Sequence, residues 1–142
     1  MSDDGGTQLV FLSIPARAEF IALTRLALTG LSRVRPFPEE LLADLKLAIT
    51  EACSNSVRHA YENGEGTVEI VYRLEPERIE IEVSDDGTGF DHSGAGELPE
   101  EGGMSEGGLG IAIIRSIADE IEIGVGGDGR GSRLRFARTL DA

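Results

Sequence analysis

The chain has 142 residues, a formal net charge of -13 at pH 7 and a pI of about 4.5. This length suits one compact domain, and 40% hydrophobic residues suffice for a globular core, although aromatic residues are scarce. The strong negative charge argues against direct binding of nucleic acid or of an anionic membrane surface.

The N-terminal sequence and the single cysteine bear on the cellular compartment. The first residues are acidic and polar, unlike a secretory signal, and no apolar run approaches the roughly 20 residues of a membrane span. Cys53, as the single cysteine, can form no intramolecular disulfide. We therefore expect a cytoplasmic protein with no membrane segment.

The first part of the chain predicts a strand and a helix. Residues 1–7 are polar and glycine-rich, so we expect a flexible N-terminus ahead of a single domain over 8–142. An apolar run predicts a strand over 8–14, and helical spacing predicts a helix over 16–29 that ends at Gly30. The apolar positions that define this helix are Phe20, Leu23, Ala27 and Leu28.

A second helix is predicted over 38–61, where a proline and two acidic residues open the first turn. A polar row of Glu51, Asn55 and Arg58 runs directly beside its apolar stripe. The row should therefore lie at the margin of the core, where a pocket can open. The stripe consists of Leu41, Leu45, Ala48, Ala52 and Ser56.

Two alternating segments predict a pair of strands joined by a turn at 75–76. Continuing the alternation past Val83 turns Asp85 inward and Asp86 outward. Asp85 is therefore the acid expected on the buried side. The inward positions before it are Val68, Ile70, Tyr72, Ile79, Ile81 and Val83.

The last third predicts a long loop, a helix and a hairpin. Residues 91–108 are rich in Gly and Glu, which is typical of a lid or binding loop. A helix should follow over 109–118, and strands over 120–125 and 132–137 should close the chain. In the last strand we expect Ser132, Leu134 and Phe136 to face inward and Arg133 and Arg135 outward.

Glu51 and Asn55 are one helical turn apart on the same face. A carboxylate can take a proton from a nucleophile, and an amide oxygen can bind a hard cation such as Mg²⁺. The pair alone would mean little, since a helix-surface Glu and a helix-surface Asn are the alternatives. Two glycine-rich segments downstream make the pattern specific.

Four segments together resemble the boxes of the GHKL ATPase superfamily. The segment 49–61 resembles the N-box. The other three are the glycine boxes at 84–90 and 106–119 and the Gly-Ser pair at 131–132. Their order and separation in so short a chain are most similar to the anti-sigma-factor serine/threonine kinases of the RsbW and SpoIIAB type. The resemblance implies the Bergerat ATP-binding fold. That fold is an α+β two-layer sandwich, in which a mixed, mainly antiparallel sheet is covered on one face by about three helices.

The base of ATP is expected at the first glycine box. A carboxylate at Asp85 can accept a hydrogen bond from the amino group of adenine, which guanine lacks at that position, and the resemblance implies this role. A turn-forming aspartate is the alternative. Gly87 and Gly89 allow the backbone to approach the base closely. Ser132 faces inward and can support Asp85.

The triphosphate is expected at the N-terminus of the helix in the second glycine box. The resemblance implies Mg²⁺ binding by Asn55 and a general-base role for Glu51. Arg58 and His59 can reach phosphate oxygens, although a packed histidine explains His59 as well. The lid has no obvious phosphate-binding Lys or Arg, so the γ-phosphate must be neutralised by Mg²⁺, by Arg58 or by a helix N-terminus. That N-terminus is formed by Gly107, Gly108, Leu109 and Gly110.

The resemblance implies an ATP-dependent protein serine/threonine kinase that acts as an anti-sigma factor. Its expected partners are a STAS-domain anti-anti-sigma protein as substrate, a sigma factor that it sequesters, and a second copy of itself in a homodimer. The alternative is a non-enzymatic, ATP-gated protein-binding module. A sensor histidine kinase fragment is disfavoured, because neither His59 nor His92 lies on a dimerising helix ahead of the ATP domain.

Overall fold

The structure is a computed structural model that describes residues 6–61, 66–85, 106–125 and 132–140. The described strands form one five-stranded sheet in the order β1-β2-β3-β5-β4. The strands are β1 (Gln8–Pro15), β2 (Thr67–Leu74), β3 (Arg78–Asp85), β4 (Glu120–Val125) and β5 (Ser132–Thr139). The helices are the 3-10 helix η1 (Ala18–Phe20) and the α-helices α1 (Ile21–Val34), α2 (Glu39–Tyr61) and α4 (Glu106–Ile117).

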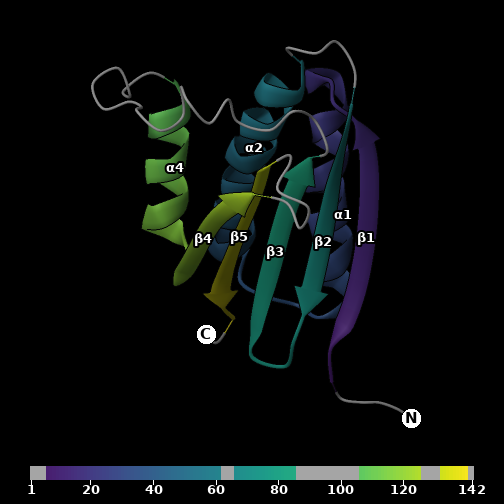
Figure 1. Ribbon diagram of the computed structural model, residues 1–142. Coiled ribbons are helices and arrows are strands. Elements are labelled where there is room, and N and C mark those ends of the chain that lie inside the picture. Colours follow the sequence, from purple (N-terminus) through teal and green to yellow (C-terminus); the bar gives the residue numbers. More distant parts are fainter. Residues whose placement is uncertain (1–5, 62–65, 86–105, 126–131, 141–142) are drawn as a thin grey trace.

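The architecture is a two-layer α+β sandwich, as the sequence predicts. The helices lie on one face of the sheet, with α2 between α1 and α4 (Figure 1). Every pair of neighbouring strands is antiparallel, so no parallel pair of the expected mixed sheet occurs among the described strands. No helix in the described ranges is long and apolar enough to cross a membrane.

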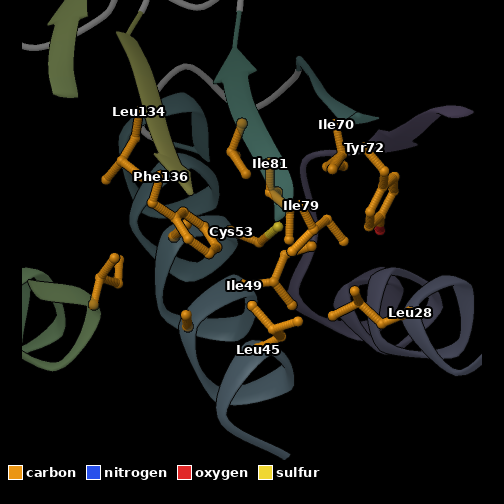
Figure 2. Close-up of a cluster of buried hydrophobic side chains, with 14 of the residues drawn as sticks. Leu28, Leu45, Ile49, Cys53, Ile70, Tyr72, Ile79, Ile81, Leu134 and Phe136 are labelled. Carbon is orange, nitrogen blue, oxygen red and sulfur yellow. The ribbon is translucent and has the colours of Figure 1, made fainter. Parts of the chain in front are cut away.

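The core lies between the sheet and the helices, and α2 contributes most of its helical side. All five residues of the predicted α2 stripe are buried, and so is every predicted inward residue of β2 and β3. Figure 2 shows some of these side chains, among them Leu45 of α2 and Ile81 of β3, in the same buried cluster as Phe136 of β5 and Leu28 of α1. The Tyr72 hydroxyl, buried in this core, donates a 2.9 Å hydrogen bond to the Thr24 carbonyl of α1. The strand alternation read from the sequence is therefore confirmed.

The first helix differs from its prediction at both ends. It begins at Ile21 and continues through Gly30 to Val34, where Arg35 and Pro36 follow. A glycine inside a helix costs about 1 kcal/mol, which the burial of Leu31 beyond it offsets. The predicted stripe is also wrong at Leu23, whose side chain is 42% exposed. The residues buried on this helix are Ile21, Thr24, Leu28 and Leu31.

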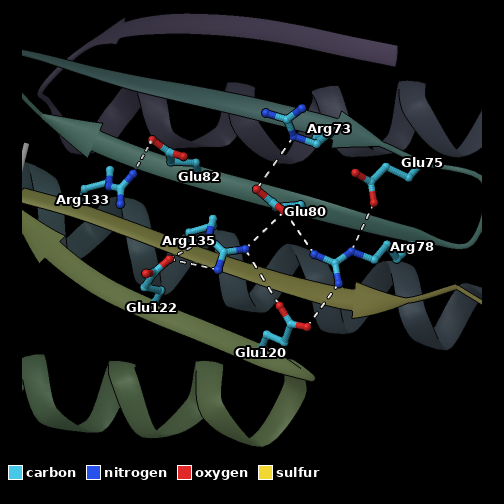
Figure 3. A network of polar contacts seen from close by, with 9 residues as sticks. All are labelled: Arg73, Glu75, Arg78, Glu80, Glu82, Glu120, Glu122, Arg133 and Arg135. Carbon is cyan, nitrogen blue, oxygen red and sulfur yellow. Dashed lines mark hydrogen bonds and ion pairs between the residues drawn. The ribbon is translucent and has the colours of Figure 1, made fainter. Parts of the chain in front are cut away.

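The open face of the sheet carries a network of ion pairs (Figure 3). Arg133 and Arg135 point to this face, as predicted. Glu80 lies at the centre of the network, where its carboxylate contacts three guanidinium groups. The arginines of the last strand are thus neutralised by their neighbours. The residues of the network are Arg73, Glu75, Arg78, Glu80, Glu82, Glu120, Glu122, Arg133 and Arg135.

Candidate functional site

Asp85 ends β3 on the helix-covered side of the sheet. Its side chain and that of Ser132 are both 6% exposed, and the Ser132 hydroxyl donates a 2.6 Å hydrogen bond to Oδ2 of Asp85. The contact forms because β3 and β5 are neighbours in the sheet. The predicted inward orientation of both residues is confirmed, and so is the support that Ser132 gives Asp85. The adenine-reading role stays a prediction.

The polar row of α2 lies at the margin of the core, as the sequence predicts. Glu51 and Asn55 are half-buried beside the fully buried Ala52, while Arg58 is exposed. Arg58 Nη2 donates a 3.3 Å hydrogen bond to Oδ1 of Asn55, the oxygen that would bind a cation. This bond places a positive charge next to the row.

Helix α4 begins at Glu106, earlier than the predicted residue 109. Gly107, Gly108 and Leu109 therefore belong to its first turn, which has unpaired N–H groups suited to an anion. Gly110 follows and is buried against α2. A Cβ placed on Gly110 would lie 2.9 Å from Oε1 of Glu51. The start of α4 therefore lies over the polar row.

Several predicted residues lie outside the described part of the structure. These are Gly87 and Gly89, together with most of the lid at 91–108. His59 lies within α2, but its side chain is not described. Their roles remain predictions.

The buried thiol of Cys53 belongs to the core rather than to the site. The side chain is fully buried on the inner face of α2. Burial raises the pKa of Cys53 to about 12, against a smaller opposite effect of a hydrogen bond with Thr24. The thiol is therefore protonated at neutral pH and unsuited to nucleophilic chemistry.

The described residues offer little to a metal ion apart from Asn55. Among them, no three His, Cys, Asp or Glu side chains gather as a metal site. Mg²⁺ nevertheless fits this donor set, because it keeps several waters and takes phosphate oxygens as ligands. An amide oxygen on α2, one helical turn beyond the Glu51 that faces Gly110 of α4, is sufficient for that mode of binding.

Two contacts in the site were not predicted from the sequence. The hydrogen bond from Arg58 to Asn55 follows a helical spacing of three residues, so the sequence did contain a signal for it. The approach of Gly110 to Glu51 joins two helices and needed the fold. The sequence signal for such a close approach between helices is a glycine inside a helix.

Comparisons with known proteins find similarity over most of the chain. The histidine kinase-like ATPase domain family matches residues 14–137. A serine-protein kinase RsbW of Listeria innocua serovar 6a is 38% identical over 124 residues, covering 80% of this chain and 78% of that protein. An RsbW of Bacillus cereus is 36% identical over 122 residues, covering 79% and 74%.

Two solved structures share the fold. The RsbU and RsbW domains of a Mycobacterium tuberculosis protein superpose with a TM-score of 0.68 at 18% identity, over 93% of this chain and 32% of that one. The chain thus spans about a third of that larger structure. A component of the SiaB-SiaC complex of Pseudomonas aeruginosa superposes with a TM-score of 0.64 at 15% identity, over 92% and 89%.

Proposed function

We propose that this chain, which belongs to the histidine kinase-like ATPase family, is an ATP-dependent protein serine/threonine kinase of the RsbW type. Sequence similarity to serine-protein kinases over about four fifths of the chain supports the activity. The proposed kinase domain covers residues 8–142. The ATP-gated binding module without transfer is less well supported, because the similar proteins bear the name of kinases.

The observation that carries the proposal is the position of Glu51 under the start of α4. We assign Glu51 as general base. The serine hydroxyl oxygen of the substrate attacks the γ-phosphorus of ATP while its proton passes to the Glu51 carboxylate. The bond between that phosphorus and the bridging oxygen breaks, and ADP leaves. The N–H groups of Gly107, Gly108 and Leu109 are proposed to hold the phosphates.

Mg²⁺ is proposed as the cation, held by Asn55. When bound, it would neutralise phosphate charge during the transfer. Arg58 already donates to Asn55 Oδ1, so its guanidinium is close enough to this position to contribute positive charge. This matters because the protein as a whole carries a net charge of -13. Asp85, with Ser132 and the backbone at Gly87 and Gly89, is proposed to bind the adenine.

The proposed substrate is a STAS-domain anti-anti-sigma protein, as the similarity to RsbW-type kinases implies. The proposal further includes sequestration of a sigma factor in the ATP-bound state. It places the protein in the cytoplasm, where sigma factors act. The ion-paired face of the sheet offers no excess of unpaired arginines among its described residues, which argues against a purely electrostatic partner contact there.

A homodimer is also part of the proposal, and β1 supports it. This strand lies at an edge of the sheet, and residues 8–15 carry no charged side chain. Phe11 is 72% exposed and Leu9 is 48% exposed on its outer side. Natural edge strands usually carry charges that prevent pairing. An uncharged edge with exposed apolar residues suits the addition of a second copy.

The test is transfer of the labelled γ-phosphate of ATP, with Mg²⁺, to STAS-domain proteins from the same genome. Wild type and Glu51→Ala are compared with Glu40→Ala, which removes an exposed glutamate from the first turn of the same helix. We expect one protein to be labelled by wild type and Glu40→Ala and not by Glu51→Ala. Full transfer by Glu51→Ala would refute the general base. ATP binding without transfer to any candidate would favour the binding module.

A further inference from the structure

Helices α2 and α4 meet where Gly110 faces Glu51. Gly110 is buried, and a Cβ built on it would lie 2.9 Å from Oε1, 3.6 Å from Cβ and 3.8 Å from Cδ of Glu51. Real Cβ atoms essentially never approach another heavy atom to within 3.0 Å. The carboxylate of Glu51 therefore lies in space that any other residue at position 110 would fill.

The conformational freedom of glycine does not explain this position. Gly110 lies in a regular helix, and the one positive φ angle among the described glycines is at Gly66. Glycine is among the poorest helix formers, so its presence here needs another reason. Nor is its N–H among the free donors of the helix, because Gly110 is the fifth residue of α4 and follows the first turn.

We propose that Gly110 is a positioning residue for the kinase reaction. The absence of its side chain lets α4 approach α2, and the resulting space sets where the Glu51 carboxylate lies. The inference rests on the proposed role of Glu51 as general base. In this inference Gly110 positions the Glu51 carboxylate, whereas the residues before Gly110 in α4 bind the phosphates.

The contact has a specific consequence for an alanine at this position. The closest atom, Oε1, is the end of a flexible side chain, so the clash can be relieved by rotation of the Glu51 carboxylate. The packing of the two helices can then persist. Gly110→Ala should leave the fold and the nucleotide affinity intact and displace the Glu51 carboxylate.

The experiment measures kcat, KM for ATP and thermal stability of Gly110→Ala. Gly30→Ala is the matched control, since Gly30 also lies inside a helix but a Cβ added to it would have no heavy atom within 4 Å. For Gly110→Ala we expect kcat to fall about tenfold to a hundredfold, with KM for ATP changed by less than about twofold. Gly30→Ala should leave both values unchanged.

A second background tests the contact itself. In Glu51→Asp the carboxylate is withdrawn from Gly110, so the further change Gly110→Ala should cost less than about threefold in kcat. The placement can also be followed without activity. The side-chain carboxyl resonance of Glu51, assigned by loss in Glu51→Gln, should shift in Gly110→Ala and stay in place in Gly30→Ala.

The outcomes separate this inference from the proposed function. If Glu51→Gln loses transfer while Gly110→Ala retains it, the positioning role is refuted and the general base stands. A raised KM for ATP with unchanged kcat in Gly110→Ala would also refute it, because Gly110 would then serve the nucleotide. If Glu51→Gln transfers at the wild-type rate, the proposed base itself is wrong, whatever Gly110→Ala does to the resonance.

Discussion

The hydroxyl of Ser132 donates a hydrogen bond of 2.6 Å to Oδ2 of Asp85, although the two residues are 47 positions apart in the chain. Both side chains are buried at the end of neighbouring strands. A buried donor of this kind fixes the rotamer of the carboxylate and stabilises its charge. Asp85 is thereby held as an oriented hydrogen-bond acceptor, which is the chemistry that an adenine amino group requires.

Asp85→Asn should weaken ATP binding, because an amide presents an NH₂ group where the carboxylate only accepts. We expect the Kd for ATP to rise about tenfold to a hundredfold, the usual effect of losing a hydrogen bond to a charged group. Isothermal titration calorimetry measures it, with Glu82→Gln on the outward face of the same strand as control. An unchanged Kd would show that the adenine is bound elsewhere.

Ser132→Ala should have a smaller effect on the same equilibrium. The carboxylate remains and loses one buried donor, so we expect the Kd for ATP to rise about threefold to tenfold. The same calorimetry measures this change, and an unchanged Kd in Ser132→Ala would contradict the support role.

Asn55→Ala should remove the part of ATP affinity that depends on Mg²⁺. Binding is measured with Mg²⁺ and with EDTA, and the two affinities should become equal within about twofold in the variant. Ser54→Ala, at the preceding position of α2, is the control and should keep the dependence of wild type. A full Mg²⁺ effect in Asn55→Ala would assign the cation to other ligands.

Phe11→Glu should dissociate the proposed homodimer. A charge placed on the exposed apolar edge of β1 should raise the dimer dissociation constant by about tenfold or more, with little effect on folding because Phe11 is 72% exposed. Sedimentation equilibrium measures the constant. Leu26→Glu on α1, where the side chain is 64% exposed, is the control. A dimer that survives Phe11→Glu but not Leu26→Glu would move the interface to α1.

Cys53 should make stability depend on pH in alkaline solution. Burial raises the pKa of the thiol from its ordinary value of 9.0 to about 12, so above about pH 9 the unfolded chain loses a proton that the folded protein keeps. The stabilisation is complete below pH 9 and is lost as the pH rises toward 12. Urea unfolding of wild type and Cys53→Ala should show the advantage of wild type falling by about 1.4 kcal/mol per pH unit in this range. A constant difference would refute the shift.

Much of the site could be predicted because its residues follow from local periodicity. The alternation through Val83 predicts the inward orientation of Asp85, and helical spacing places Glu51 and Asn55 beside the buried stripe of α2. Both periods are properties of the backbone that hold regardless of which elements become neighbours. The ranges of α2 and β4 were predictable for the same reason.

What could not be predicted depends on contacts between elements. Gly30 reads locally as a helix end, yet packing of Leu31 carries α1 past it. The alternation turns Glu80 outward, but only the assembled sheet brings arginines of β2, β3 and β5 to its carboxylate. Gly110 reads as part of a phosphate-binding helix N-terminus, while its contact with Glu51 exists only once α4 lies on α2.

The neighbouring placement of β3 and β5 has a consequence for how such a domain can diversify. Asp85 ends β3 and Ser132 begins the adjacent β5, and the hydrogen bond between them holds together the two ends of the intervening chain, which also contributes α4 and the edge strand β4. Doubling the length of a loop with fixed ends costs only about 0.6 kcal/mol. Changes of length between β3 and α4 can therefore accumulate during evolution, while the carboxylate proposed to bind the adenine keeps its place.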